Sequence, residues 1–77
     1  MYDALIKLNS IKDLYSFVDI LDKHSCTFEI VANDYVVDAK SLMSMLSLDL
    51  SKPLELSFDS DEASDILSQL QPFILHE

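Results

Sequence analysis

The sequence contains no glycine and no arginine among its 77 residues. Phosphate-binding loops and dinucleotide-binding fingerprints are therefore excluded, because both need backbone that approaches the ligand without a Cβ atom. The lack of arginine also removes the guanidinium fork that grips phosphate with two hydrogen bonds. Fourteen acidic residues against five lysines give a net charge of −9. We expect neither nucleic acid nor a membrane surface as a partner, whereas a basic protein is compatible with this charge.

Cysteine and long apolar runs are also scarce. Cys26 is the only cysteine, so no internal disulfide can form and a reducing, cytoplasmic setting is expected. No apolar run is long enough to span a bilayer, and the N-terminus lacks the pattern of a secretory signal. A length of 77 residues with 49% hydrophobic residues predicts one packed domain covering 1–77.

The hydrophobic pattern predicts the order strand, helix, strand, strand, helix, strand, helix. Strands are expected at 4–8, 27–32, 35–38 and 54–58. Helices are expected at 11–23, from Ser41 onward, and from a start within 59–62 to an end before Pro72. This order predicts an α+β fold with three helices on one face of a four-stranded antiparallel sheet. The apolar tail at 73–75 is expected to pack back onto the domain.

Local signals support the boundaries of these elements. Ser10 with Asp13, and Asp59 with Glu62, have the spacing of helix capping boxes. The first helix has an apolar stripe at helical spacing, widened by two further residues, which comprises Ile11, Leu14, Tyr15, Phe17, Val18, Ile20 and Leu21. The pair Asn33-Asp34 indicates a hairpin turn. Strict alternation over 54–58 predicts a strand with one buried and one solvated face.

The stretch from Val36 to Leu48 is the most informative part of the chain. A polar break separates an apolar strand end from a short helix, in which Leu42, Met45 and Leu46 share one face. Met43 lies off that face and has two interpretations. It fills an irregular gap in the core, or it forms part of an exposed docking patch. Physical reasoning alone favours the core.

The same stretch resembles the histidine-containing phosphocarrier (HPr) family of the bacterial sugar phosphotransferase system. In that family a Lys-Ser-apolar-Met segment opens the short second helix, which ends in Met-Ser-Leu, as in Lys40–Leu48 here. The acidic run at 57–63 before the last helix is similar too. The resemblance covers roughly Ile6 to Leu70 and implies the family's open-faced β-sandwich, in agreement with the pattern.

The resemblance also implies where phosphate transfer would occur. In the family, a phospho-acceptor His lies at the N-terminus of the first helix, followed by an Arg and a Pro, and these positions fall on Ser10, Lys12 and Asp13. A phosphoserine ester passes phosphate on far less readily than a phosphohistidine, and the Asp13 carboxylate would repel a phosphate. His24 and His76 lie elsewhere, near the other end of the first helix and in the tail. We therefore expect no catalytic residue and no phosphotransfer through His.

Two further family features carry over to the short helix. The Ser that a dedicated kinase (HPr kinase) phosphorylates for regulation falls on Ser41, which is otherwise simply a helix N-cap. The family's docking surface, which meets the phosphate-donor enzyme, the sugar-specific subunits and transcriptional regulators, falls on Leu42, Met43 and Leu46. These are the residues that we expect to bind proteins.

Other candidate sites are weak. The run Asp59–Asp61 lacks the Gly and the final Glu of a calcium loop, and a pairing of His24 with Cys26 has no third orienting group. No metal or cofactor is expected. Three functions stay open: a protein-binding or regulatory HPr-like module without His phosphotransfer, a divergent but active phosphocarrier, and an acidic structural module that binds a basic partner.

Overall fold

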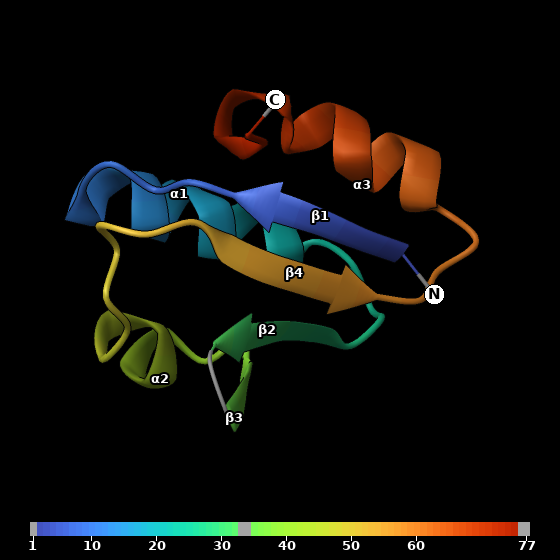
Figure 1. The fold of residues 1–77 in the computed structure, drawn as a ribbon. Coiled ribbons are helices and arrows are strands. Elements are labelled where there is room, and N and C mark those ends of the chain that lie inside the picture. Colours follow the sequence, from blue (N-terminus) through green and yellow to red (C-terminus); the bar gives the residue numbers. More distant parts are fainter. Residues whose placement is uncertain (1, 33–34, 76–77) are drawn as a thin grey trace.

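The computed structural model describes residues 2–32 and 35–75 (Figure 1). The elements are β1 (Tyr2–Ile6), α1 (Ile11–Asp22), β2 (Phe28–Ala32), β3 (Tyr35–Asp38), α2 (Leu42–Leu46), β4 (Leu54–Phe58) and α3 (Ala63–Gln69), followed by a 3-10 turn at Gln71–Phe73. Their order confirms the prediction. The expected hairpin turn at Asn33-Asp34 lies outside the described residues.

The four strands form one antiparallel sheet in the order β1-β4-β2-β3. The α+β arrangement of a four-stranded antiparallel sheet with three helices is thus the predicted one. In Figure 1 the long helix α1 lies behind the sheet, and α2 lies at the end of the sheet where α1 begins. The opposite face of the sheet points toward the viewer and carries no helix.

The hydrophobic core lies between the sheet and the helices. Strands β1, β2 and β4 supply Ile6, Phe28 and Leu56, which are fully buried. The Phe28 and Phe58 rings pack with their centroids 5.3 Å apart. From the helical side, α1, α3 and the C-cap of α3 contribute Leu14, Phe17, Leu21, Ala63, Ile66 and Leu70.

Strand β1 is displaced toward the N-terminus relative to the predicted 4–8. Its five residues pair along the whole of β4, from Tyr2 opposite Phe58 to Ile6 opposite Leu54. The C-terminal tail pairs with the other edge of β1 at Ile6, opposite Ile74, and the Lys7 N–H donates to the Phe73 carbonyl at 2.8 Å. The Leu75 N–H donates in turn to the Leu5 carbonyl at 2.9 Å. The tail packs back as predicted, and β1 ends at Ile6, opposite the first residue of β4, Leu54.

The predicted apolar stripe of α1 is too wide. Leu14, Val18 and Leu21 are buried, but Ile11 and Tyr15 are 49% and 50% exposed. The buried face of α1 is centred on Leu14, Phe17 and Leu21. Ile11 and Tyr15, which are four residues apart, therefore lie together on the flank of that face.

Two predictions for the end of the chain need correction. Helix α3 begins at Ala63 with Glu62 as its N-cap residue, which makes no side-chain cap, so the helix begins later than a cap at Asp59 predicted. The Ser60 hydroxyl instead accepts from the Glu62 N–H at 3.0 Å, which places a turn before the helix.

Ser57, on the strand face of β4 predicted to be solvated, is only 8% exposed. It lies in the central strand between Asp3 and Glu29, which cover it.

Candidate functional site

The N-terminus of α1 is closed by a variant of the predicted capping box, in which the reciprocal bond goes to the Asn9 N–H rather than to the Ser10 N–H. The Ser10 backbone is extended, with φ −158° and ψ 168°, and its hydroxyl accepts from the Asp13 N–H at 3.2 Å. The Asp13 carboxylate accepts in return from the Asn9 N–H at 3.1 Å. Ser10, the residue onto which the resemblance maps the acceptor, is therefore a helix cap with a carboxylate in the same turn.

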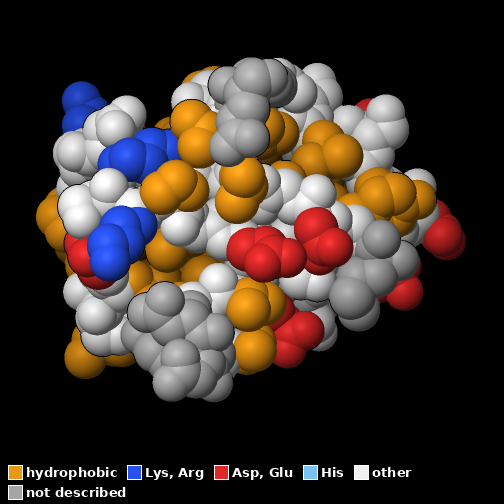
Figure 2. Space-filling model, in the orientation of Figure 1, with side chains coloured by type: hydrophobic (Ala, Val, Ile, Leu, Met, Phe, Trp, Pro, Cys, Tyr) orange, Lys and Arg blue, Asp and Glu red, His pale blue; other side chains and the backbone are white. Residues whose placement is uncertain are grey.

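Lysine side chains surround this end of the molecule. Lys12 is exposed in the first turn of α1, and the Lys7 ammonium donates to the Leu50 carbonyl at 3.0 Å. Figure 2 shows that the lysines on this face gather at one end, next to an acidic side chain, while most of the acidic side chains lie toward the centre and the opposite end. Positive charge is therefore present at this end of the molecule, as ammonium groups without a guanidinium fork.

Helix α2 begins at the predicted residue. Ser41 is its N-cap, and the hydroxyl accepts from the Ser44 N–H at 3.5 Å and donates to the Ser44 hydroxyl at 3.2 Å. The Ser41 carbonyl accepts from the Met45 N–H at 2.9 Å. The capping role of Ser41 is therefore present in the structure.

The two methionines of α2 point in opposite directions. Met45 is fully buried, whereas Met43 is 81% exposed, so the interpretation of Met43 as a core filler is wrong. Leu42 is half-buried and Leu46 is 40% exposed. A helix of five residues has one face against the core, and Met45 already occupies it.

The exposed apolar side chains of α2 have counterparts on the neighbouring helix α1, which contacts α2. Ile11 and Tyr15 are about half exposed and follow directly after the capping box. We call Ile11, Tyr15, Met43 and Leu46 together the helical patch. Sequence reasoning placed Ile11 and Tyr15 in the core. The available signal was a stripe wider than one buried face of a helix needs.

Lys40 holds the segment that leads into α2. Its ammonium donates to the His24 carbonyl and lies 5.6 Å from the centroid of the Phe28 ring. Its backbone N–H donates to the Asp38 carboxylate at 2.9 Å. The lysine that the family pattern places before Ser41 therefore ties this segment to the end of α1 and to the core.

His24 is placed near the C-terminal end of α1, as predicted, and away from Ser10. Its ring nitrogens lie 3.1 Å from the Gln69 amide oxygen and 3.5 Å from the Glu62 carboxylate, and its side chain is only 10% exposed. These partners on α3 and its N-cap explain the residue without the thiol of Cys26. His76 lies outside the described residues.

The remaining polar features hold no obvious centre. Within residues 2–32 and 35–75, no three His, Cys, Asp or Glu side chains are placed to bind a metal ion. In that same part of the chain, no helix has both the length and the apolar character needed to cross a membrane. At Asp49, where the family pattern has Gly, the Ser51 hydroxyl donates to the carboxylate at 2.6 Å and the Ser51 N–H at 3.0 Å. These bonds lower the pKa of Asp49 below its usual 3.8.

Comparison with solved structures now identifies the fold. The chain has the HPr fold. HPr-C-His from Thermoanaerobacter tengcongensis superposes with a TM-score of 0.77 at 23% identity, covering 94% of this chain and 89% of that one. The histidine-containing phosphocarrier protein of Mycoplasma superposes with a TM-score of 0.68 at 16% identity, covering 92% and 86%. No protein-family model matches the sequence, and no curated protein matches it either.

Proposed function

We propose that this protein is an HPr-like module of the cytoplasm that binds other proteins without carrying phosphate on a histidine. The observation that carries the proposal is the 81% exposure of Met43, the residue that the family pattern places in its docking surface. Evolution of a soluble domain rarely leaves a large apolar side chain so exposed within a wider apolar patch unless the patch binds something.

The structure of the α1 N-terminus supports the lack of phosphotransfer. A histidine acceptor needs an imidazole nitrogen facing solvent, and this position holds the hydroxyl of Ser10, bonded to the Asp13 N–H. The Asp13 carboxylate, in the same turn, would repel an incoming phosphoryl group. Lys12 supplies positive charge but not the paired donors of an arginine.

The helical patch supports docking. Its four apolar side chains come from two contacting helices, and apolar anchors at the centre of an interface supply most of its binding energy. By analogy with the HPr proteins, the partners are the phosphate-donor enzyme, the sugar-specific subunits or transcriptional regulators of the phosphotransferase system. A domain that keeps the docking surface and lacks the acceptor competes with an active phosphocarrier for those partners.

Phosphorylation of Ser41 would regulate binding at the helical patch. Its hydroxyl directly precedes Leu42 and Met43, so a phosphate there would add about two negative charges next to the helical patch. Desolvating that charge in an apolar interface is costly, and phosphorylation by an HPr kinase would therefore weaken docking. Because Lys40 is already engaged with the His24 carbonyl and Phe28, it is poorly placed to neutralise the added charge.

Intact-mass measurement at neutral pH tests the absence of transfer. The protein is incubated with the phosphate-donor enzyme and phosphoenolpyruvate, beside an active HPr as the positive control. We expect the active HPr to gain one phosphate and this protein to gain none, while calorimetric titration shows that it binds the donor enzyme. A stable added phosphate on a histidine would support the alternative of a divergent, active phosphocarrier.

A second incubation, with an HPr kinase and ATP, tests the phosphoserine. One added phosphate on the wild type and none on Ser41→Ala would establish the switch. No added phosphate on either protein would leave docking alone, without regulation at Ser41.

A further inference from the structure

The face of the sheet that carries no helix has a regular arrangement of side chains. Alternate residues of each strand point to this outer side, because successive side chains of a strand point to opposite faces and the core residues occupy the inner face. The outward positions are Asp3 and Leu5 of β1, Glu29 and Val31 of β2, Val36 and Asp38 of β3, and Glu55 and Ser57 of β4.

The strand register sorts these eight residues into two rows across the sheet. One row is apolar except for one carboxylate, and runs through Leu5, Glu55, Val31 and Val36. The other row is polar and runs through Asp3, Ser57, Glu29 and Asp38. With neighbouring strands about 4.8 Å apart, each row is about 14 Å long. We call these eight residues the outer sheet face.

The outer sheet face has four carboxylates and no cationic residue. Three of the five lysines are engaged elsewhere: Lys7 at the Leu50 carbonyl, Lys23 with Asp19 at 3.9 Å, and Lys40 over the Phe28 ring. Of the other two, Lys12 lies on α1, and Lys52 lies in the segment before β4. Carboxylates lie next to apolar side chains on the face seen in Figure 2. Within the apolar row, Leu5 and Val36 are 39% and 53% exposed, so apolar contact area is open to solvent beside the acids.

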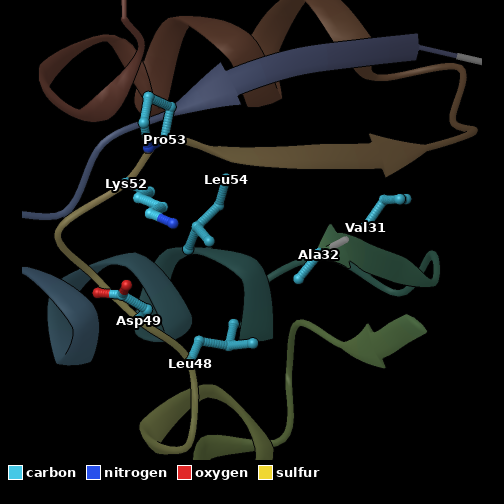
Figure 3. A pocket seen from close by; sticks show the side chains of 7 residues that line it. All are labelled: Val31, Ala32, Leu48, Asp49, Lys52, Pro53 and Leu54. Atoms are coloured by element: carbon cyan, nitrogen blue, oxygen red, sulfur yellow. The ribbon is translucent and has the colours of Figure 1, made fainter. Parts of the chain in front are cut away.

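A pocket of about 130 Å³ adjoins the apolar row. Val31 is shared by the row and the pocket wall, and the other lining residues are Ala32, Leu48, Asp49, Lys52, Pro53 and Leu54. It opens where the β2–β4 pairing stops, at Val31 opposite Glu55. Figure 3 shows these side chains around the space between the ends of β2 and β4 and the segment that leads into β4. Five of the seven lining residues are apolar, and Asp49 and Lys52 add charged groups to the wall, so an apolar side chain in the pocket would contact both apolar and polar surface.

We propose that the outer sheet face binds a basic peptide segment of a partner protein, in which Lys or Arg side chains alternate with apolar ones. The cationic side chains meet Asp3, Glu29 and Asp38 in the polar row. The apolar side chains cover Leu5, Val31 and Val36, and one of them enters the adjoining pocket. This surface is made of strand residues and is distinct from the helical patch, whose residues belong to α1 and α2, and the inference does not depend on the proposed function.

Charge complementarity selects this occupant over a second copy of the chain. Two outer sheet faces brought together would oppose four carboxylates with four more, and like charges in direct opposition are unfavourable. The chain as a whole carries a charge of −9, which further disfavours self-association. The apolar row in turn distinguishes a mixed segment from a purely polar polycation, which would leave Leu5 and Val36 exposed.

Titration followed by amide NMR tests the proposal with two synthetic peptides of equal length and charge. In the first, Lys alternates with Val, and in the second, Lys alternates with Ser. We expect the Lys–Val peptide to shift the backbone amides of the outer sheet face and of the pocket, and to bind about fivefold more tightly than the Lys–Ser peptide, because only it covers the apolar row. Its affinity should fall as salt is raised.

Two double variants with the same net charge separate the surface from the overall charge. Glu29→Lys with Glu55→Lys reverses two carboxylates of the outer sheet face, and Asp22→Lys with Asp65→Lys reverses two on α1 and α3. Each of the four substitutions adds two charges, so both variants change the net charge from −9 to −5. We expect the first variant to lose about tenfold in affinity for the Lys–Val peptide and the second to lose about twofold or less.

A third variant, Val36→Ser, leaves the charge unchanged and removes an exposed apolar side chain, so that folding is preserved. It should reduce the preference for the Lys–Val over the Lys–Ser peptide. Equal losses in the two double variants, or equal affinities for the two peptides, would overturn the proposal in favour of binding by overall charge. A wild-type dimer that Glu29→Lys with Glu55→Lys disrupts would also overturn it, because the occupant would then be a second copy.

Discussion

The helical patch and the outer sheet face both expose apolar side chains, but their surroundings differ. In the helical patch, four apolar residues lie on two short stretches of helix, beside serine caps and with lysines nearby. On the outer sheet face, the exposed Leu5 and Val36 lie in the apolar row, which runs beside the polar row and its three carboxylates. Binding at the first surface should therefore depend little on salt, and binding at the second should depend on it strongly.

The difference between the two sides of α2 gives the largest expected effect. Met45→Ala should reduce the free energy of unfolding by about 2–5 kcal/mol, because Met45 is fully buried in the core. Met43→Ala is the matched control and should change it by about 0.5 kcal/mol or less, since 81% of Met43 is exposed. Urea denaturation measures both values. A large loss of stability in Met43→Ala would show that this residue is structural rather than part of a docking surface.

Met43→Glu separates binding from stability. A carboxylate in the helical patch should weaken docking of the phosphate-donor enzyme by about tenfold or more, because an unpaired charge is desolvated in the interface. Val36→Glu adds the same charge on the outer sheet face and should leave that docking unchanged. Isothermal titration at two salt concentrations distinguishes the surfaces. Equal losses in the two variants would mean that overall charge, and not the helical patch, governs the interaction.

The two serine caps should differ in their contribution to folding. Ser10→Ala removes one half of a reciprocal capping box on a helix of 12 residues, and we expect a loss of about 1 kcal/mol. Ser41→Ala removes a longer bond of 3.5 Å on a helix of five residues, and the loss should be about half as large. Thermal unfolding of both variants provides the comparison, with Ser16→Ala on the exposed side of α1 as the control. A larger loss at Ser41 would reverse the assigned order of the caps.

The smallest effect concerns Asp49, at the edge of the pocket. The hydrogen bonds from the Ser51 hydroxyl and N–H hold its pKa below 3.8 in the folded protein. Because the pKa is lower in the folded than in the unfolded chain, Asp49 stabilises the fold at pH values above its unfolded pKa. This contribution is lost as the pH falls through the folded pKa. Ser51→Ala should raise the pKa of Asp49 toward 3.8, as measured by NMR of the carboxyl carbon. An unchanged pKa would show that the hydroxyl bond is not the main cause.

Much of the fold could be predicted from local patterns in the sequence. The serine caps at Ser10 and Ser41 set the starts of α1 and α2, and the alternation at 54–58 located β4 to the residue. These signals are local, since a cap bonds to a backbone group three residues away and alternation follows from the pleat.

The errors arose where distant parts of the chain decide the outcome. The end of β1 depends on β4, which is distant in the sequence and whose first residue, Leu54, pairs with Ile6. The burial of Ser57 depends on its place in the central strand, between Asp3 and Glu29.

The candidate site was predicted only in part, for the same reason. The sequence pattern pointed to Met43 and Leu46 through the resemblance to HPr, whereas physical reasoning alone placed Met43 in the core. Ile11 and Tyr15 were assigned to the core because apolar residues at helical spacing look alike whether they are central or flanking. Which residues lie on the flank depends on how α1 rotates against the sheet, and no local pattern in the sequence records that rotation.

The most direct test of the account is a titration of the phosphate-donor enzyme against three forms of the protein. These are the wild type, Met43→Glu, and the double variant Glu29→Lys with Glu55→Lys. We predict that the wild type and the double variant bind with similar affinity and that Met43→Glu binds about tenfold more weakly or not at all. Full binding by Met43→Glu, or a loss confined to the double variant, would contradict the claim that the helical patch is the docking surface.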